Sequence, residues 1–394
     1  MEKVLSAVKR YDLAIINRSF WPTHSTKGSE LKANGEAYLQ FGEKASTIVK
    51  DVVFITQYTG NLKKTADKFG RGLNLLFRSC KSRSDSSSKL LFRIFDNIIF
   101  MLWVFWSLII TRPKKIFLAT DPPLTVPFIV FIYSKIFKAS YVYSVQDIHP
   151  EITNIVVKFN PLLFSFLKKV DGLVMRHASS IITITQTMKD EIIARSNTKS
   201  NIYLIDNPTN SVDEPIQLKI KGFIFSGTFG RVQNIPLLLK SIDKYKAEGG
   251  ILPFLFIGGG WYANEVQSLS IKYTDITYAG LVDPKKADEL TSGYEWALLP
   301  MDDEATKYAF PSKSSSYISS GLNILSICSE QTSVAKWVVN NNYGINARPK
   351  VVDIVDVFFK IENGLTINKK TVDQDYYSIN NYVSKIFNVV FNKV

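Results

Sequence analysis

The 394-residue chain contains few of the residues that build disulfide frameworks and metal sites. It has two cysteines, Cys80 and Cys328, and three histidines, His24, His149 and His177. The cysteines lie far apart and lack the short spacing of metal ligands, which argues against a zinc site and a disulfide framework and fits a reducing compartment. So few histidines leave little room for a histidine-based metal site. We therefore expect a protein without a bound metal or a resident cofactor.

The chain also lacks a long uninterrupted hydrophobic run. Its start, MEKVLSAVKRYDLAIINRSF, does not contain the continuous apolar stretch of a signal peptide, so we expect the chain to remain inside the cell. The most hydrophobic segment, IIFMLWVFWSLII at 98–110, is shorter than the roughly 20 residues that span a bilayer. Its tryptophans and basic flanks favour a helix lying in the membrane interface, with Trp103 and Trp106 as anchors. A buried core helix is the alternative.

Acidic residues are too few to balance the basic ones. The chain has 48 Lys and Arg against 35 Asp and Glu, which gives a formal net charge of +13. Such a balance is typical of proteins whose partners are nucleic acids, anionic membranes or phosphorylated small molecules. The basic residues do not combine with aromatics into a readable nucleic-acid-binding module, so we do not expect a nucleic-acid partner.

What the chain does have is a regular alternation of short apolar runs and helical stretches. Runs that are rich in β-branched and aromatic residues and end in polar, Gly or Pro residues predict strands at 12–20, 48–58, 114–123, 139–150, 178–186 and 200–208. Helices are predicted between them, for example at 88–110, 124–137, 161–176 and 186–195. This order predicts a parallel, doubly wound sheet whose functional residues lie at the carboxyl ends of its strands.

The same alternation begins again after a linker rich in Pro, Asp and Ser, DNPTNSVDEPIQLKIK. Further strands are predicted at 222–229, 252–260, 275–282, 296–301, 323–328 and 343–349. We therefore predict an α/β protein with two Rossmann-like, doubly wound domains that face each other across a cleft. The first domain is expected at 1–210, the second at 211–372, and a closing helix at 373–394 is expected to return to the first domain.

Two glycines and an arginine follow the first strand of the second half, in FSGTFGRVQN at 225–234. Glycines let backbone amides approach phosphate oxygens, and an arginine can bind two such oxygens at once. We interpret Gly227, Gly230 and Arg231 as a binding site for phosphate oxygens. A tight strand-to-helix turn with a surface arginine is the alternative.

Four motifs together resemble the family-4 glycosyltransferases of the GT-B fold, in particular the branch that builds bacterial O-antigen, capsule and colanic-acid-type polysaccharides. The motifs are TDPPL at 120–124, YVYSVQDIHPE at 141–151, FSGTFGRVQN at 225–234 and FPSKSSSYISSGLNIL at 310–325. The resemblance covers nearly the whole chain. It implies transfer of a sugar from a nucleotide diphosphate-sugar to an acceptor, usually with retention of configuration and without a bound metal.

The resemblance places the donor site in the second domain. Pro311 is expected in the first turn of a helix, so that Ser312 and Lys313 lie at a helix N-terminus that attracts anions. The lysine that usually follows the arginine is replaced at Gln233 or Asn234. The usual ribose-binding carboxylate falls at Ser316 and an earlier one near Tyr308, and neither residue is acidic. The expected donor-binding residues are Gly227, Gly230, Arg231, Gln233, Gly258, Leu281, Ser312, Lys313 and Ser316.

The first domain is expected to hold the acceptor. The segment QDIHPE places Asp147, His149 and Glu151 after a strand, where a carboxylate or an imidazole can receive a hydroxyl proton. Capping of the following helix is the alternative for Asp147. The expected catalytic residues are Asp147, His149, Glu151, Arg231 and Lys313, and the expected acceptor-binding residues are Asn17, Arg18 and Asp121.

These observations lead to one main hypothesis and one alternative. The hypothesis is a cytoplasmic glycosyltransferase, peripherally bound to the inner face of the cell membrane, that uses a nucleotide diphosphate-sugar as co-substrate. It would extend a lipid-linked glycan during surface polysaccharide biosynthesis. The missing lysine and carboxylate leave a catalytically silent subunit or scaffold of a polysaccharide assembly complex as the alternative. A GT-B epimerase would share the fold, but the sequence lacks clear acid–base carboxylates near the second-domain glycines.

Overall fold

The structure is a computed structural model, and it describes residues 10–18, 33–58, 62–68, 70, 72, 74–83, 90–209, 218–368 and 375–392. The chain divides into two compact units. Unit 1 consists of the residues up to Glu151, of Phe159–Asp206 and of the segment that starts at Ile379, whereas unit 2 consists of Ile152–Lys158 and Asn207–Ser378. Residues 152–158, which the sequence placed in the first domain, thus group with unit 2.

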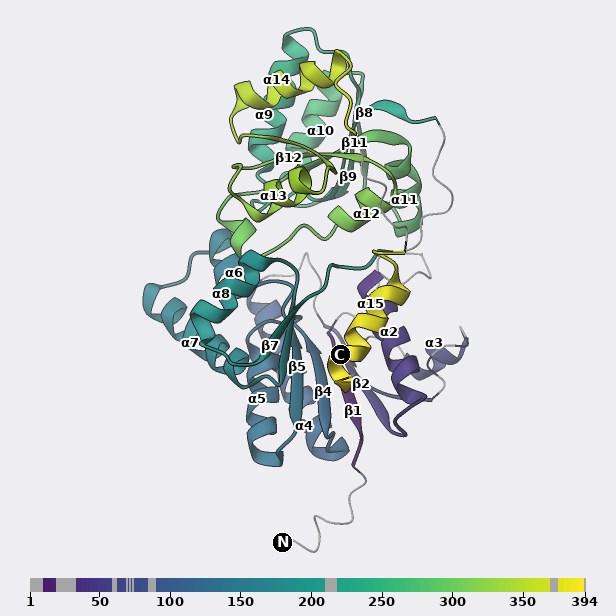
Figure 1. Cartoon of the computed structure of the whole chain (residues 1–394), viewed down its shortest axis with the longest axis vertical. Helices are drawn as coiled ribbons and strands as arrows, with labels where there is room; N and C mark the ends of the chain where they lie inside the picture. The colour runs from purple at the N-terminus through teal and green to yellow at the C-terminus, as the bar shows by residue number, and fades with distance from the viewer. Residues whose placement is uncertain are drawn as a thin grey trace, which may run out of the picture. The chain divides into compact units, whose positions relative to one another are not determined.

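Unit 1 is built on a seven-stranded parallel sheet with the order β3-β2-β1-β4-β5-β6-β7 (Figure 1). Its strands are β1 (Leu13–Ile16), β2 (Val52–Gln57), β3 (Leu75–Cys80), β4 (Lys115–Ala119), β5 (Ser140–Ser144), β6 (Ser180–Thr183) and β7 (Asn201–Leu204). Strand β1 pairs with both β2 and β4, so the winding direction reverses there. Because crossovers are right-handed, this reversal places helices on both faces of the sheet.

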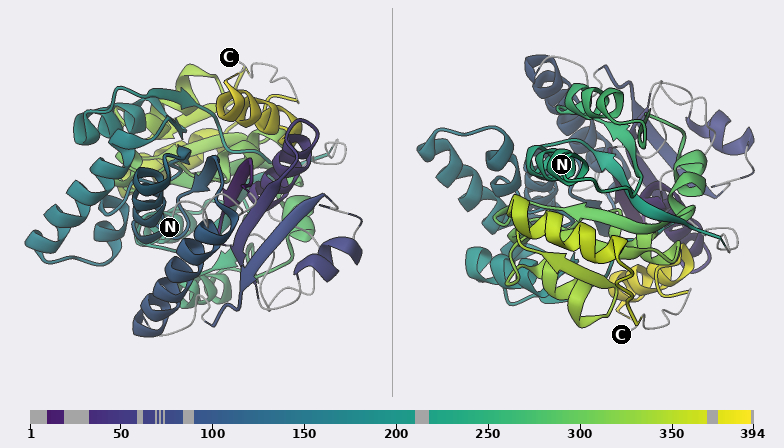
Figure 2. Two further views of the ribbon diagram at one scale, coloured as in Figure 1. Left: turned by 90° about the horizontal axis from the view of Figure 1, so that it is seen from below. Right: turned by 90° about the horizontal axis from the view of Figure 1, so that it is seen from above.

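The helices of unit 1 lie on the two faces of this sheet. They are α2 (Ala33–Ser46), α3 (Leu62–Lys68), α4 (Leu90–Thr111), α5 (Thr125–Phe137), α6 (Glu151–Val156, shared with unit 2), α7 (Pro161–His177), α8 (Gln186–Ser196) and α15 (Ile379–Phe391). Helices α2 and α15 lie side by side (Figure 1). Helix α4 packs on α5, and α5 packs on α7; Figure 2 (left) shows α4 in dark blue as the longest helix of unit 1.

The core of unit 1 includes residues from both ends of the chain. Side chains of β1 and β2, such as Ile15 and Phe54, pack in one cluster with Tyr382, Ile386 and Val390 of α15. These α15 residues recur every four positions and therefore share one face of the helix. Helix α15 is thus an integral part of unit 1.

Three elements of unit 1 were not predicted from the sequence, namely α2, α3 and β3. Strand β3 is at the edge of the sheet, where Leu75 is buried but 77–80 are only partly buried. Arg78 also interrupts its apolar pattern. An edge strand with one exposed side does not need the continuous apolar run that marks the central strands. Residues 84–89, in the serine-rich stretch that follows β3, lie outside the described residues.

Unit 2 is built on a six-stranded parallel sheet with the order β10-β9-β8-β11-β12-β13. Its strands are β8 (Ile220–Thr228), β9 (Phe254–Gly259), β10 (Ile276–Gly280), β11 (Tyr294–Pro300), β12 (Asn323–Ile327) and β13 (Gly344–Ala347). Its further helices are α9 (Ile235–Ala247), α10 (Ala263–Lys272), α11 (Pro284–Ser292), α12 (Ser314–Ser319), α13 (Ser333–Asn340) and α14 (Val351–Glu362). Phe223, Phe254, Tyr245 and Phe358 form an aromatic cluster that joins the sheet to α9 and α14.

The predicted fold class is therefore confirmed as two Rossmann-like units, each with a doubly wound parallel sheet. Each of the twelve strands named from the sequence overlaps a strand in the structure.

Candidate functional site

The expected donor-binding residues lie at one edge of the unit 2 sheet. All six strands are parallel, so their carboxyl ends share that edge. Gly227, Gly258, Leu281 and Lys313 lie at or after the ends of β8, β9, β10 and β11, which are consecutive in the sheet in the order β10-β9-β8-β11. The fold thus brings together four segments that are distant in the sequence.

The glycines of β9 allow its end to lie directly against the loop after β8. Gly258 is opposite Gly227 in the sheet and has a φ of +133°, and a Cβ on it would lie 1.9 Å from the carbonyl oxygen of Gly227. Gly260 has a φ of +143°, and a Cβ there would lie 2.8 Å from the carbonyl oxygen of Phe229. Only glycine fits these two positions. In contrast, a Cβ at Gly227 would meet nothing closer than 3.6 Å.

The loop between β8 and α9 is held at both ends by backbone hydrogen bonds. The amide of Tyr262, after β9, donates to the carbonyl oxygen of Phe229 at 3.1 Å. The amide of Asp302, after β11, donates to the carbonyl oxygen of Val232 at 2.8 Å. Gln233 lies in the same loop, and its Oε1 would be 2.7 Å from a Cβ on Gly230. The loop therefore has a fixed backbone between the ends of β9 and β11.

Arg231 lies on this loop and is exposed to solvent. Its guanidinium carbon lies 5.2 Å from the ring centroid of Trp261, in the geometry of a cation–π contact. One guanidinium nitrogen donates to the carbonyl oxygen of Val156 at 3.1 Å, and Val156 belongs to the 152–158 segment of unit 2. Within the described part of the chain no carboxylate forms an ion pair with Arg231. Its positive charge therefore has no carboxylate partner among those residues.

Helix α12 follows β11 and begins at Ser314, with Lys313 as the preceding cap residue. Pro311 was expected in the first turn of this helix, and that prediction is wrong. Pro311 precedes the helix, and its carbonyl oxygen accepts a hydrogen bond from the amide of Ser314 at 3.1 Å. Ser312 is exposed and Lys313 is partly exposed. Lys313 therefore does lie at the start of a helix, although this helix has six residues.

A tyrosine joins α12 to the glycine loop. The hydroxyl of Tyr317 accepts a hydrogen bond from the amide of Ser226 at 2.9 Å and donates to the carbonyl oxygen of Ser226 at 3.2 Å. Ser226 directly precedes Gly227. The helix that follows Lys313 is therefore attached to the strand end that precedes Arg231.

The position of the usual ribose-binding carboxylate is filled by a buried serine. Ser316 lies in α12 and is 7% exposed. The nearby acidic residues are used locally: Asp303 accepts hydrogen bonds from the amide of Ser329, at 2.8 Å, and from its hydroxyl, and Asp302 caps the short 3-10 turn after β11. Glu304 is exposed. Asp302 and Asp303 are thus occupied by local contacts.

Two large apolar side chains are exposed at the same edge. Trp261, directly after β9, is 74% exposed, and Leu281, directly after β10, is 85% exposed. Leu281 was expected from the sequence, whereas Trp261 was missed. The signal that could have indicated Trp261 is its position immediately after the three glycines that end a buried strand.

In unit 1, Asp147 and His149 lie after the carboxyl end of β5 and are half-buried. Loss of solvation raises the pKa of Asp147 to about 6, because burial disfavours the charged carboxylate. Loss of solvation and the nearby charge of Arg195 lower the pKa of His149 to about 4. At neutral pH this pair is therefore a carboxylate with a raised pKa beside a neutral imidazole.

Glu151 is placed differently from these two residues. It is 5% exposed, and its carboxylate forms ion pairs with Lys168, at 3.2 Å, and with Arg195. Arg195 also forms an ion pair with the buried Asp171 at 2.5 Å and donates to the carbonyl oxygen of His149 at 2.6 Å. These ion pairs join the start of α6 to α7 and α8. The geometry therefore supports a structural role for Glu151 as the alternative to a catalytic one.

The acceptor-binding candidates lie at the carboxyl ends of β1 and β4. Asn17 is 6% exposed, and the amide of Arg18 donates to the carbonyl oxygen of Asp121 at 3.1 Å. The guanidinium of Arg18 forms an ion pair with the fully buried Asp96 of α4 at 3.0 Å. It also donates to Gln57 at 2.7 Å and to Asn97. The Arg18 side chain is thus occupied by contacts inside unit 1.

Helix α4 carries an exposed apolar stripe along its full length. The helix has 22 residues, so the apolar segment is longer than the thirteen residues that the sequence pattern marked at 98–110. It is long and apolar enough to cross a membrane, by length and composition alone. Its opposite face includes Asp96, Phe100, Val104 and Leu108, which are fully buried. The exposed residues that form the α4 stripe are Leu91, Phe95, Ile98, Leu102, Trp106 and Ile110.

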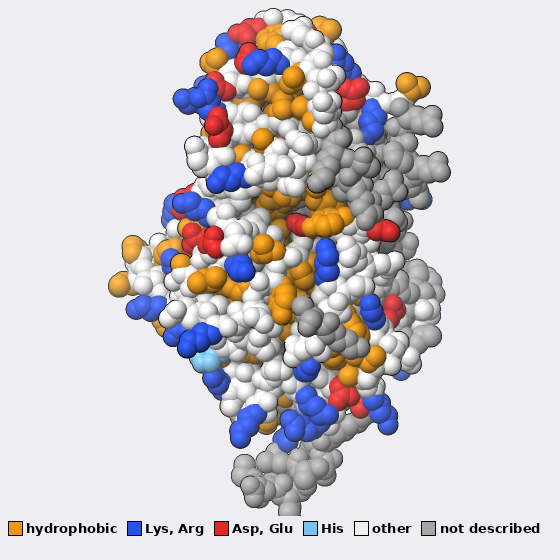
Figure 3. Space-filling model, in the orientation of Figure 1, with side chains coloured by type: hydrophobic (Ala, Val, Ile, Leu, Met, Phe, Trp, Pro, Cys, Tyr) orange, Lys and Arg blue, Asp and Glu red, His pale blue; other side chains and the backbone are white. Residues whose placement is uncertain are grey.

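Of the two expected membrane anchors, only Trp106 lies on the α4 stripe. Trp106 is 57% exposed. Trp103 is partly buried and contacts the guanidinium of Arg78 on β3, which lies 5.3 Å from its ring centroid. Lys and Arg side chains gather at the lower end of unit 1 in Figure 3. In the chain, Lys114 directly precedes β4 and Lys115 is its first residue.

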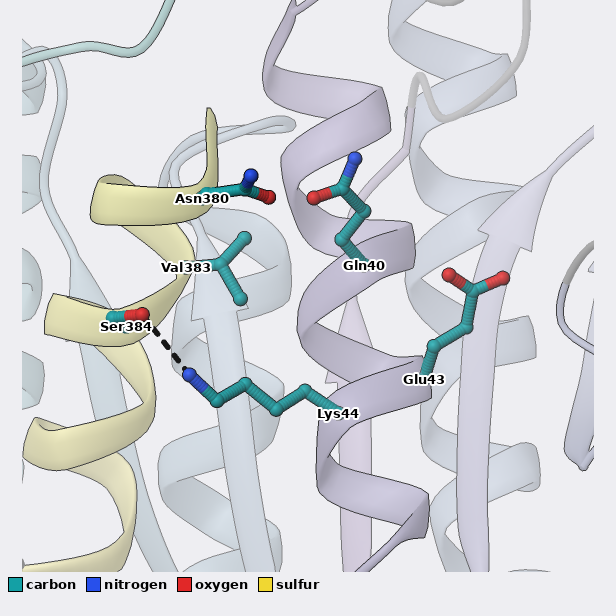
Figure 4. A pocket seen from close by; sticks show the side chains of 6 residues that line it. All are labelled: Gln40, Glu43, Lys44, Asn380, Val383 and Ser384. Atoms are coloured by element: carbon teal, nitrogen blue, oxygen red, sulfur yellow. Dashed lines mark hydrogen bonds between the residues drawn. The ribbon is translucent and has the colours of Figure 1, made fainter. Parts of the chain in front are cut away.

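Two surface hollows in unit 1 contain none of the candidate residues. One, of about 490 Å³, lies between α2 and α15, where Lys44 donates to Ser384 at 3.0 Å (Figure 4). The other, of about 640 Å³, is lined by Arg176, Lys199 and small polar residues near the starts of β6 and β7. Among the described residues, no group of three or more His, Cys, Asp and Glu side chains could hold a metal ion.

Comparison of the sequence with family models and with curated proteins gives no match. Comparison with solved structures gives matches over nearly the whole chain. A sucrose-phosphate synthase from Thermosynechococcus elongatus has 12% identity and a TM-score of 0.63, with 97% of this chain and 95% of that chain covered. Anabaena HepE in complex with UDP has 10% identity and a TM-score of 0.60, with 96% and 95% covered.

WaaG, described as a glycosyltransferase involved in lipopolysaccharide biosynthesis, has 9% identity and a TM-score of 0.60, with 96% and 99% covered. A putative UDP-N-acetylglucosamine 2-epimerase from Listeria monocytogenes has the same fold, with 9% identity, a TM-score of 0.60 and 98% of each chain covered. At these identities the likeness establishes the GT-B type of two-unit fold. The activity has to be argued from the site.

Proposed function

We propose that this protein is a glycosyltransferase of the family-4 type that transfers a sugar from a nucleotide diphosphate-sugar to an acceptor. The observation that carries the proposal is Arg231, which has no carboxylate partner among the described residues and lies on a glycine loop at the carboxyl edge of a Rossmann-like sheet. Structural neighbours with this fold include a protein in complex with UDP and a glycosyltransferase.

The chemistry of the donor site follows from its charges. When the bond between the sugar and the diphosphate breaks, negative charge grows on the departing phosphate oxygens. Arg231, Lys313 and the amides near Gly227 and Gly230 would stabilise that charge. The proposed reaction proceeds with retention of configuration and without a bound metal.

In unit 1, Asp147 and His149 are the proposed acceptor-side residues. A carboxylate whose pKa is about 6 can accept the proton of an acceptor hydroxyl near neutral pH. Glu151, buried against Lys168 and Arg195, would act instead as a positioning residue for the segment that carries this pair.

The proposed acceptor is a lipid-linked glycan of surface polysaccharide biosynthesis, met at the inner face of the cell membrane. Support comes from the α4 stripe, because a lipid surface would cover an apolar helix face of this length, and from the excess of positive charge, which anionic lipids attract. The buried face of α4 and the Arg18–Asp96 ion pair tie the helix into unit 1, which favours a helix lying in the interface over one that crosses the membrane.

Arg231→Ala tests the proposal most directly. The parent would be incubated with a panel of nucleotide-sugars and a lipid-diphosphate-linked saccharide, and the product would be identified by mass spectrometry. Loss of one preorganised contact to the departing charge should lower the transfer rate by ~10²–10³-fold. Lys240→Ala, which removes an exposed charge of α9, is the matched control and should retain the parent rate. A rate for Arg231→Ala within a few-fold of the parent would contradict these roles.

A catalytically silent subunit of a polysaccharide assembly complex is the second candidate. The observations in its favour are the buried Ser316 in place of a carboxylate and Gln233 in place of a lysine. Isothermal titration with UDP, GDP, CDP, ADP and dTDP separates the two functions. A silent scaffold should bind none of them, whereas the proposed enzyme binds at least one.

A further inference from the structure

The backbone around Trp261 is fixed, yet its side chain is exposed. The residue follows Gly260, whose positive φ brings the end of β9 against Phe229. The amide of the next residue, Tyr262, donates to the carbonyl oxygen of Phe229 at 3.1 Å. Trp261 itself is 74% exposed. A large aromatic side chain that is exposed on a fixed backbone is available to contact a neighbouring side chain.

The indole of Trp261 is used to hold Arg231. The guanidinium carbon lies 5.2 Å from the ring centroid, and the one hydrogen bond that the side chain makes to a described residue goes to the carbonyl oxygen of Val156. An indole orients a guanidinium through its π face without neutralising the positive charge. The N–H groups at the edge of the guanidinium then remain available for two oxygens of one anion.

Two arginines of unit 1 that lie near candidate residues are held by carboxylates. Arg18 forms its ion pair with Asp96, and Arg195 forms ion pairs with Glu151 and Asp171. A carboxylate fixes an arginine but also cancels the charge that would attract an anion. Arg231 instead contacts an indole and a backbone carbonyl oxygen, neither of which cancels its charge.

We propose that Trp261 is a positioning residue of the donor site, which holds the Arg231 guanidinium toward the diphosphate of a nucleoside diphosphate. This inference rests on the proposed function, since it needs a diphosphate ligand at the same loop. Trp261 acts through Arg231, so its effect on binding should disappear when the arginine is absent.

A double-mutant cycle tests this coupling. The dissociation constant of the nucleoside diphosphate that the parent binds best would be measured by isothermal titration for the parent, Trp261→Ala, Arg231→Ala and the double variant. A cation–π contact at an exposed site corresponds to about two- to fivefold in affinity, so Trp261→Ala should weaken binding to that extent. In the Arg231→Ala background the same change should have no further effect.

Two more variants serve as controls. Trp261→Phe keeps an aromatic face and should bind within about twofold of the parent. If Trp261 served only to stabilise the fold, binding would not depend on whether the replacement is aromatic. Ile271→Ala removes another highly exposed apolar side chain, on α10, and should bind like the parent. Circular dichroism and thermal unfolding of each variant would verify that it is folded.

The outcomes are distinct. Parent-like binding by Trp261→Ala overturns the inference and leaves the proposed function standing. An equal loss with and without Arg231 also overturns it, because the indole would then contact the ligand directly. If the parent binds no nucleoside diphosphate, the proposed function fails and this inference fails with it.

Discussion

At the residue scale, the partners of each arginine separate structural roles from binding roles. Arg195 lies between Glu151 and Asp171, and Arg18 lies against Asp96, all of them buried carboxylates. Removing one member of such a buried pair typically costs about 3–5 kcal/mol of folding stability, so these arginines belong to the framework. Arg231 has an indole and a carbonyl oxygen instead.

The two glycines that face each other across β8 and β9 should respond differently to alanine. At Gly258 the new Cβ would lie 1.9 Å from the carbonyl oxygen of Gly227 and φ is +133°, so Gly258→Ala should lower the free energy of unfolding by several kcal/mol. At Gly227 the new Cβ would meet nothing closer than 3.6 Å, so the variant should fold. Its methyl group would nevertheless lie at the strand end that is proposed to bind the diphosphate.

Urea unfolding and nucleoside diphosphate titration of both variants would check this contrast. We expect Gly227→Ala to unfold at a urea concentration near that of the parent and to bind the nucleotide more weakly. A Gly258→Ala protein as stable as the parent would show that the close approach of the two strand ends is not required.

Asp147 predicts a pH dependence of transfer. Its raised pKa of about 6 means that the carboxylate form, which can accept a proton, becomes dominant only as the pH rises through 6. Transfer should therefore increase about tenfold between pH 5 and pH 7, since the ionised fraction rises about that much. The His149 imidazole, with its pKa lowered to about 4, stays neutral over this range and adds no second step.

The measurement is the initial rate of transfer at saturating donor as a function of pH. Asp147→Asn should be slow at every pH and should lack the rise near pH 6. A parent profile that is flat from pH 5 to pH 7 would exclude Asp147 as the proton acceptor.

At the element scale, α4 is the least expected part of unit 1. One face supplies Asp96 and apolar side chains to the interior, and the other presents the α4 stripe to the outside. A soluble helix usually has polar residues on its outer face. The α4 stripe is therefore the surface that we propose to lie against a membrane, and because Trp103 contacts Arg78, the proposed anchors are Leu102 and Trp106.

Flotation with vesicles that contain anionic lipid tests the membrane hypothesis. The parent should float, and a Leu102→Glu, Trp106→Glu double variant should bind at least about tenfold more weakly, because each buried apolar side chain contributes about 1.5–3 kcal/mol. Ile271→Glu places a charge on an exposed apolar position of unit 2 and should float like the parent. Equal flotation of the double variant and the parent would refute the role of α4.

At the scale of the whole molecule, the donor candidates and the acceptor candidates belong to different units. Gly227, Arg231 and Lys313 are in unit 2, and Asp147 and His149 are in unit 1. Unit 1 is completed by α15 and unit 2 by residues 152–158, so neither unit is one continuous stretch of chain. Each unit is therefore assembled from segments that are distant along the chain.

Hydrogen exchange with and without a nucleoside diphosphate should show this division. A ligand at 100 times its dissociation constant stabilises the folded protein by about 2.7 kcal/mol, and the amides that contact it gain the most protection. We expect the largest protection in 226–234 and 258–262 of unit 2. Protection confined to unit 1 would show that the nucleotide binds there, and it would contradict the proposed donor site in unit 2.

The sequence by itself determined the order of twelve of the strands, the division into two alternating halves and the glycine loop with Arg231. These features depend on local periodicity and on the conformational freedom of glycine, which a short stretch of sequence expresses directly. Strand β3 was missed because a half-exposed edge strand does not need a strong apolar pattern.

Only the tertiary structure decided which charged side chains are free. The sequence does not distinguish Glu151, Arg18 and Arg231, since all three belong to or follow a predicted strand. In the structure, Glu151 and Arg18 form ion pairs with buried charged side chains, whereas Arg231 contacts Trp261. The partners lie far away along the chain: Asp96 is 78 residues from Arg18. Contacts of this kind are set by which strands are neighbours, and local sequence patterns do not contain that information.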